Sequence, residues 1–156
     1  MRRFRPCLDR VVDRPDDRSC VRHARSDNVG YRPFTRDGCM TDAAIVVLAG
    51  TESPADLGRV VNALQTAKEF DEEGDDVTLI FDGAGTKWVR ELEDEDHDYH
   101  ALYAAVSHLA EVCVYCVGAY GVNDAVDDSE VDRIDDYEGH PSIRLLVADG
   151  AEIITF

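Results

Sequence analysis

The chain has 156 residues, enough for one domain with a sizeable core. It contains no run of about 18 apolar residues that could span a membrane, and its start lacks the apolar region of a secretory signal. We therefore expect a cytoplasmic protein whose five cysteines stay reduced. The net charge of −17 opposes binding to nucleic acid and to anionic membranes, so we expect neither partner.

The charge is unevenly distributed along the chain. Residues 1–39 hold ten Arg and six Asp, whereas residues 40–156 hold six Lys or Arg and 27 Asp or Glu. This excess of carboxylates, with only two lysines, resembles the composition of proteins from salt-loving archaea, where it maintains solubility at high salt. We interpret the acidic residues as a solvated surface rather than a binding site.

The first 39 residues are expected to lie outside the folded domain, which would comprise residues 40–156. The segment has few aliphatic residues, three Pro and no helical or strand period. It cannot bury enough apolar surface to offset the entropy lost on ordering. The composition changes abruptly at Met40, which predicts a disordered tail or an extension produced by a wrongly assigned start. Cys7, Cys20 and Cys39 would then carry no function.

A strand and a helix open the patterned part of the chain. Residues 44–49 form a continuous apolar run, typical of a strand buried on both faces. Ser53 suits a helix N-cap and Pro54 suits the first helical position, and apolar residues then recur at spacings of three and four. This pattern predicts a helix over 54–72.

Strands and helices continue to alternate. We predict a strand over 77–81, a helical segment through 86–92 and a second over 99–110. The third strand, 112–115, carries a Cys-x-x-Cys at its carboxyl end.

The last third of the chain is less regular. Residues 123–138 are acidic, with a short strand predicted over 131–134. A final helix is predicted to begin at His140-Pro141-Ser142 and to end at Gly150, before a closing strand over 151–156. The apolar face of this helix is expected to comprise Ile143, Leu145, Leu146 and Val147.

The order of elements predicts the fold class. Strands that alternate with helices form a mostly parallel sheet of four to five strands with helices on both faces, a three-layer α/β/α fold. Chemistry in such sheets collects at the carboxyl ends of the strands. Cys113 and Cys116 are expected there and are the candidate functional residues.

The two thiols can meet only if the chain leaves the strand between them, because residues i and i+3 of a strand point to opposite faces. Residues 117–121 permit a turn into a short helix. Cys116 would then lie near the N-terminus of this helix, where the helix dipole lowers the pKa of a thiol. No Lys or Arg lies within the segment to add to this effect.

Four interpretations of the thiol pair are open. One thiol could carry a persulfide that the other assists or resolves, or the pair could be a dithiol/disulfide couple. His97-x-x-His100 followed by the Cys-x-x-Cys supplies zinc ligand types, but His97 is expected in an exposed acidic loop, so a metal is disfavoured. The fourth interpretation is two buried cysteines without chemistry. We interpret His108 and His140 as structural or surface groups.

Several motifs together resemble one known family over nearly all of residues 43–156. They are the apolar first strand with its Ser-Pro helix start, the strand end Phe81-Asp82-Gly83, Cys113-x-x-Cys116-x-x-Ala119-x-Gly121-Val122, and Gly150-x-x-Ile153-Ile154-x-Phe156. The sequence is similar in these motifs to the DsrE/DsrF-like family of sulfur-relay and sulfur-oxidation proteins.

The resemblance implies a function for the thiols. The family's functional Cys stands eight residues before the Gly of a Gly-Val, here Cys113, and a subset carries a second Cys where Cys116 stands. The family implies an α/β/α fold, a homo-oligomer (often a trimer or hexamer), no organic cofactor, and transfer of sulfane sulfur as a cysteine persulfide between donor and acceptor proteins. Several members have Arg immediately before that Gly, where this chain has Tyr120. The alternatives are a non-catalytic oligomeric α/β module and a dithiol redox protein.

Overall fold

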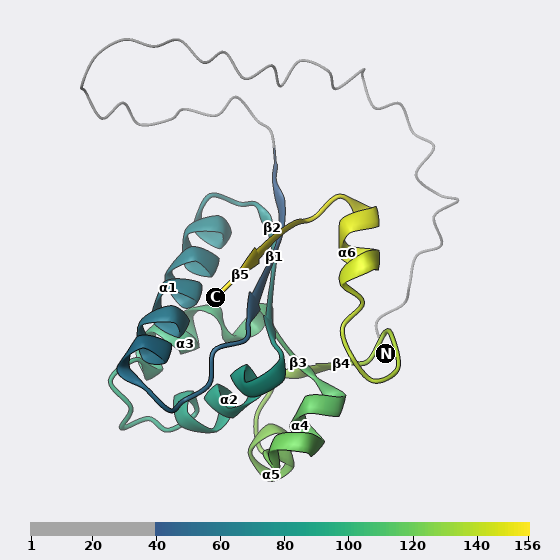
Figure 1. Cartoon of the computed structure of the whole chain (residues 1–156). Coiled ribbons are helices and arrows are strands. Elements are labelled where there is room, and N and C mark those ends of the chain that lie inside the picture. Colours follow the sequence, from purple (N-terminus) through teal and green to yellow (C-terminus); the bar gives the residue numbers. More distant parts are fainter. Residues whose placement is uncertain (1–39) are drawn as a thin grey trace, which may run out of the picture. The chain divides into compact units, whose positions relative to one another are not determined.

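The computed structural model describes residues 40–156, and the expectations for residues 1–39 lie outside the described residues. Residues 40–156 form a five-stranded sheet with helices on both faces (Figure 1). The strands are β1 Asp42–Val47, β2 Asp76–Phe81, β3 Ala110–Cys113, β4 Asp132–Ile134 and β5 Glu152–Thr155. Their order is β4-β3-β2-β1-β5, and every neighbouring pair is parallel. The predicted three-layer α/β/α fold is confirmed, with a sheet that is parallel throughout.

The helices of the described part connect these strands. The α-helices are α1 Pro54–Glu72, α2 Lys87–Leu92, α3 His100–Val106, α4 Val114–Tyr120, α5 Asn123–Asp127 and α6 Ile143–Asp149. Two short 3₁₀ helices, η2 Gly83–Thr86 and η3 Ser107–Leu109, precede α2 and β3. Figure 1 shows α1 and α3 on one side of the sheet and α6 on the other.

Strand β1, which lies between β2 and β5, contributes residues to two hydrophobic cores. Ile45 and Val47 are buried in the larger core, with residues of α1 and α3. Ala44 and Val46 belong to a smaller cluster on the other face, against which Leu146 of α6 packs. Because successive strand residues point to opposite faces, a strand covered on both sides needs the unbroken apolar run seen in the sequence.

Helix α1 occupies the predicted range, and its start has the predicted chemistry. The Ser53 hydroxyl accepts a hydrogen bond from the Asp56 backbone N–H at 3.3 Å, and Pro54 is the first helical residue. This cap satisfies one of the N–H groups that a helix leaves without an intrahelical partner.

The boundaries of two central elements differ from the prediction. The helix predicted over 99–110 ends earlier, because Ala110 already pairs with Leu79 in the sheet. The third strand ends at Cys113 rather than at residue 115, because the Tyr115 backbone N–H donates to the Gly139 carbonyl at 2.9 Å instead of continuing a strand ladder. The chain is helical from Val114, earlier than the turn expected over 117–121.

The predicted start of the last helix is wrong. Helix α6 begins at Ile143, and the Ser142 hydroxyl caps it by accepting from the Leu145 N–H at 3.3 Å. His140 instead forms a two-way backbone bridge with Tyr137, at 2.9 Å in each direction. The expected left-handed cap at Gly150 is present, with φ of 102°.

The predicted apolar face of α6 is also wrong. Only Leu146 packs on the sheet, whereas Ile143, Leu145 and Val147 are 39, 41 and 57 % exposed. Successive residues of an α-helix are about 100° apart around its axis, so 145, 146 and 147 cannot all face one sheet.

Two further features complete the described part. Helix α5 lies in the acidic stretch that was expected to be irregular, and it buries Val126. Within residues 40–156, no helix is both long and apolar enough to cross a membrane.

Candidate thiol–histidine–aspartate site

The register of the sheet brings two site residues together. Strands β2 and β3 are parallel, with Phe81 opposite Val112. The next residues along the two strands are Asp82 and Cys113, which therefore lie at the same carboxyl edge. Asp82 is half-buried, and its Oδ1 accepts from the Gly83 N–H at 2.8 Å, which starts η2.

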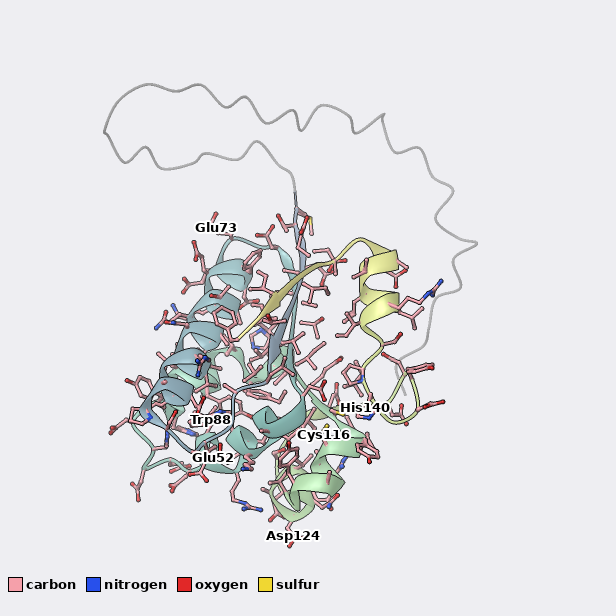
Figure 2. All side chains as sticks on the ribbon, in the orientation of Figure 1. Glu52, Glu73, Trp88, Cys116, Asp124 and His140 are labelled. Carbon is pink, nitrogen blue, oxygen red and sulfur yellow. The ribbon has the colours of Figure 1, made fainter. Side chains whose placement is uncertain are left out.

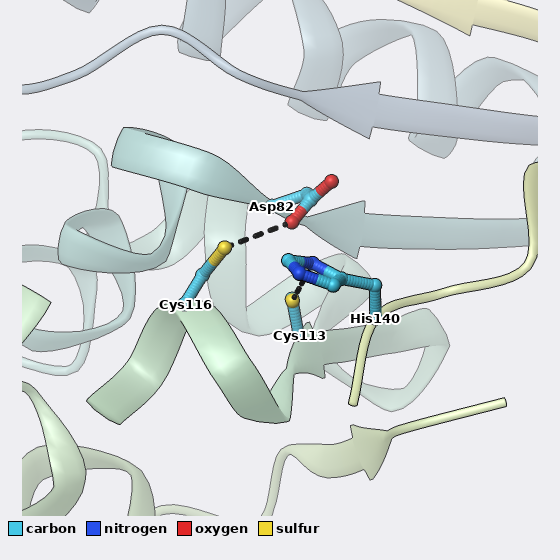
Figure 3. Close-up of side chains that lie close together, drawn as sticks. All are labelled: Asp82, Cys113, Cys116 and His140. Carbon is cyan, nitrogen blue, oxygen red and sulfur yellow. Dashed lines mark hydrogen bonds between the residues drawn. The ribbon is translucent and has the colours of Figure 1, made fainter. Parts of the chain in front are cut away.

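Cys113 is paired with a histidine from a distant loop. Its Sγ lies 3.3 Å from His140 Nδ1 (Figure 3). The Gly139 carbonyl oxygen lies 3.6 Å from the same sulfur. The Cys113 side chain is enclosed, with 0 % of the residue exposed. The His140 tautomer decides whether Nδ1 donates or accepts this hydrogen bond. Because the two atoms are within hydrogen-bond distance, a proton can move between the sulfur and the nitrogen.

Cys116 is paired with the carboxylate. It lies in the first turn of α4, and its thiol donates to Asp82 Oδ1 at 3.2 Å (Figure 3). The residue is 7 % exposed. Because the chain turns from β3 directly into α4 at Cys113, both sulfur atoms face the same site, as the sequence required for any joint chemistry.

A tight turn and a ring contact position His140. Glu138 and Gly139 both have positive φ, 51° and 86°, as the central residues of a type I′ turn do. Glu138 is the only residue other than glycine with positive φ in the described part of the chain. The His140 ring also stacks on Tyr115, with centroids 4.6 Å apart and planes tilted by 36°. Figure 2 shows His140, in the connection between β4 and α6, near Cys116 of α4.

The surroundings of the two cysteines disfavour their thiolate forms. Burial raises the pKa of Cys113 to about 12, and the neighbouring Asp82 acts in the same direction. Burial likewise raises the pKa of Cys116, and its hydrogen bond to the Asp82 carboxylate adds to the shift. The expected lowering of the Cys116 pKa by the helix dipole is therefore wrong, because desolvation of the charged form outweighs it.

The structure separates the other histidines from the thiols. His97 and His100, the sequence's candidate zinc ligands, are absent from the group that surrounds the cysteines. His100 Nδ1 instead contacts the Leu92 carbonyl at 2.7 Å. His108 is an exposed group near Asp71, as expected, whereas His140 contacts the Cys113 thiol, a partner that the sequence did not indicate.

Sequence reasoning therefore found the two thiols and missed their partners. Asp82 carried a usable signal, because it directly follows the strand that precedes the cysteine strand. His140 carried none, since its place depends on the reversal of the chain at residues 138–139.

The four side chains also have the chemistry of metal ligands. Sγ of Cys113, Sγ of Cys116, Nδ1 or Nε2 of His140 and a carboxylate oxygen of Asp82 all lie within 4.8 Å of one another. In the described part of the chain, this is the only such group of three or more residues.

The fold and the site define an α/β/α protein with an enclosed thiol pair, a histidine and a carboxylate at the carboxyl edge of its sheet. No family model matches the sequence. Over 119 residues the chain is 24 % identical to the uncharacterized protein MJ0733 of Methanocaldococcus jannaschii, an alignment that covers 76 % of this chain and 98 % of that protein. A solved structure, the conserved protein of unknown function BT1422 from Bacteroides thetaiotaomicron, matches with a TM-score of 0.49 and 16 % identity, over 72 % of this chain and 94 % of the other.

Proposed function

We propose that the protein is a DsrE-like sulfur carrier, in which Cys113 accepts and donates sulfane sulfur and Cys116 assists. One observation carries the proposal: Cys113 Sγ lies 3.3 Å from His140 Nδ1, with a second thiol in the same group. A nucleophile paired with a positioned base is the arrangement that activates a weakly acidic thiol. The base matters here because burial raises the pKa of Cys113.

The proposed loading step is a thiol exchange. His140 takes the proton from Cys113, and the sulfur attacks the outer sulfur of a donor persulfide, R–S–SH. The S–S bond of the donor breaks, a new S–S bond forms on Cys113, and the donor leaves as the thiol R–SH after taking up a proton. Nothing is oxidised or reduced overall, so the step needs no further reagent.

Cys116 is suited to the second half of the exchange. Its thiol belongs to the same group and is slightly exposed, whereas Cys113 is fully enclosed. Attack of Cys116 on the outer sulfur of the Cys113 persulfide would break that S–S bond, form a new S–S bond on Cys116 and release Cys113, which takes up a proton and leaves as the thiol. The sulfane sulfur would then sit on the slightly exposed Cys116, with no net oxidation or reduction. The Asp82 carboxylate accepts a hydrogen bond from the Cys116 thiol, which keeps the proton on this sulfur until the exchange begins.

Mass spectrometry of the loaded protein tests the proposal. The metal-free protein is incubated with inorganic polysulfide and digested with trypsin, which puts Cys113 and Cys116 on one peptide and the other three cysteines on different peptides. We expect this peptide to gain the mass of one sulfur atom, located on Cys113 by fragmentation. Cys116→Ser should still load, and His140→Gln should load about 100- to 10,000-fold more slowly, the usual loss on removing a general base.

Three outcomes would overturn the assignment. If Cys113→Ser gains the same sulfur on the same peptide, Cys113 is not the carrier. If both thiols resist polysulfide and iodoacetamide until the protein is denatured, the non-catalytic module is the better description. A reversible Cys113–Cys116 disulfide without a persulfide would instead indicate a dithiol redox protein.

The proposal includes a homo-oligomer of cytoplasmic subunits that meets separate donor and acceptor proteins. The exposed apolar side chains of α6, Ile143, Leu145 and Val147, support contact with a second copy of the chain. Light scattering should give a mass that is a multiple of the 17.3 kDa chain, and Val147→Asp should lower it. A monomer at all concentrations would remove this part of the proposal.

A further inference from the structure

The geometry points to a zinc site formed by Cys113, Cys116, His140 and Asp82, and we propose that this group binds one Zn²⁺. A tetrahedral zinc ion with Zn–S bonds of about 2.3 Å and Zn–N or Zn–O bonds of about 2.0–2.2 Å holds its ligand atoms about 3.3–3.8 Å apart. Two pairs of ligand atoms are already close to this spacing and need to open only by a few tenths of an ångström: Cys113 Sγ to His140 Nδ1 is 3.3 Å, and Cys116 Sγ to Asp82 Oδ1 is 3.2 Å.

The remaining edges need only side-chain movement. All four ligand atoms lie within 4.8 Å of one another, so the widest edge must shorten by about 1 Å. Asp82 and His140 lie in connections beyond the strand ends and are only half-buried. We expect small rotations of these two side chains, compatible with their contacts to Gly83 and Tyr115, to close the group while the cysteine backbone in β3 and α4 stays in place.

The ligand types select a zinc-like cation. Two thiolates and an imidazole are soft to intermediate donors that favour Zn²⁺ over Mg²⁺ or Ca²⁺, which prefer oxygen ligands. Four protein ligands complete a tetrahedron, as in structural zinc sites, and the enclosure of Cys113 and Cys116 excludes bulk water. Carboxylates often cluster on protein surfaces without binding a metal. Two thiols, an imidazole and a carboxylate brought together from three separated segments are a more specific ligand set for zinc.

Neighbouring groups hold the ligands in place. The Gly83 N–H fixes Asp82 through a 2.8 Å hydrogen bond to Oδ1, and Tyr115 stacks on the His140 ring. The backbone bridge between Tyr137 and His140 fixes the Cα position from which the His140 side chain extends. Such outer contacts orient metal ligands and normally accompany real sites.

Metal binding and sulfur loading use the same sulfur atoms. Zn²⁺ binding converts two thiols to thiolates and releases two protons to solvent, without any change of oxidation state. Coordination to zinc withdraws electron density from both sulfur atoms and blocks access to them, so a zinc-loaded chain should take up sulfur from polysulfide more slowly than the stripped protein. The zinc proposal does not rest on sulfur transfer, since metal content is measured without any sulfur donor.

Metal analysis of the full chain is the first test. The protein is stripped with a chelator, reduced with a phosphine, incubated with a small excess of Zn²⁺ and desalted. We expect one zinc per chain. Co²⁺ in place of Zn²⁺ should give thiolate-to-cobalt charge-transfer absorption in the near ultraviolet. Its d–d bands in the visible should have the high intensity that is typical of tetrahedral coordination. Less than about a tenth of a zinc per chain, or a cobalt spectrum without thiolate bands, would overturn the proposal.

Variants then identify the ligands. Loss of an outer contact to a metal ligand lowers metal affinity by about 10- to 100-fold. Loss of a direct ligand should cost more, so Asp82→Asn and His140→Gln should each lower the zinc affinity at least about 100-fold in a chelator competition. Matched controls are Asp124→Asn, an exposed carboxylate, and His97→Gln, the ligand that the sequence alone suggested. Both controls should bind like the wild type. Equal affinity in all four variants would exclude this ligand set.

The remaining thiols need a separate control. A variant with Ser at positions 7, 20 and 39 should keep one zinc per chain, whereas Cys113→Ser with Cys116→Ser should bind none. The reverse result would assign the metal to the other cysteines. If zinc binds as expected but stripped protein takes up no sulfur, the carrier function fails alone; if sulfur loads but zinc does not bind, the metal site fails alone.

Discussion

At the scale of single residues, the site depends on a backbone conformation as much as on reactive side chains. His140 reaches Cys113 only because the chain reverses through Glu138 and Gly139, both with positive φ. Conformations of this kind cost energy in residues with a Cβ and persist where surrounding contacts hold them. Here the Tyr137–His140 bridge and the hydrogen bond from Tyr115 N–H to Gly139 provide that support.

Gly139→Ala should destabilise the protein and loosen the site. The new methyl group would be strained at φ of 86° and would lie 3.4 Å from the Tyr115 Cβ, so we expect a loss of roughly 1–2 kcal/mol in the free energy of unfolding. Urea unfolding measures this loss, and native alkylation of Cys113 should become faster. Gly118→Ala is the matched control, since its methyl group meets no atom within 4 Å and α4 should gain about 0.5–1 kcal/mol. Equal stability of the two variants would contradict the role of the turn.

At the scale of elements, one buried tyrosine links two helices beside the sheet. Tyr103 of α3 packs against Phe81 of β2, and its hydroxyl donates to Glu93, just beyond α2, at 2.9 Å. Burial raises the pKa of Tyr103 above its ordinary value, and the adjacent Glu93 carboxylate adds to the shift. The folded protein therefore keeps this hydroxyl protonated at a pH where the unfolded chain loses the proton.

The consequence is a stability that falls at high pH. Above about pH 10 the folded state binds more protons than the unfolded state, so the free energy of unfolding decreases by up to about 1.4 kcal/mol per pH unit. Tyr103→Phe should lose about 1–2 kcal/mol at pH 7, through the missing hydrogen bond, but this deficit should shrink above pH 10. Urea unfolding at pH 7 and near pH 11 measures both, with the exposed Tyr137→Phe as control. A deficit independent of pH would contradict the assignment.

At the scale of the whole molecule, the described part carries far more negative than positive side chains. Residues 40–156 contain 27 acidic and six basic residues. Four of the basic side chains and His108 each pair with one carboxylate, so most carboxylates in this part of the chain have no cation beside them. Repulsion among like charges favours the expanded, unfolded chain. Salt should therefore stabilise the fold.

The melting temperature should rise with KCl. The Debye length falls from about 10 Å at 0.1 M to about 3 Å at 1 M, so most of the gain from screening should appear below about 1 M. Differential scanning calorimetry across this range measures the effect, and sucrose, which stabilises without screening charge, is the control. A melting temperature that does not change between about 0.1 and 1 M KCl would contradict this account.

The amino-acid sequence by itself determined those features that depend on neighbouring residues. Apolar periodicity and capping residues located β1 and the full length of α1, and the alternation of strands and helices determined the parallel α/β/α class. The Cys-x-x-Cys identified both thiols, because three residues of separation place them together once the strand ends between them.

Only the tertiary structure decided what surrounds the thiols. Asp82 is 34 residues from Cys116, and His140 is 27 residues from Cys113. Local periodicity carries no information on which strands are neighbours, on their register, or on where a turn reverses the chain. The parallel pairing of β2 with β3 brought Asp82 to the cysteines, and the turn at Glu138 and Gly139 brought His140. The same long-range packing buried the thiols, and desolvation then raised their pKa where the helix dipole alone predicted a decrease.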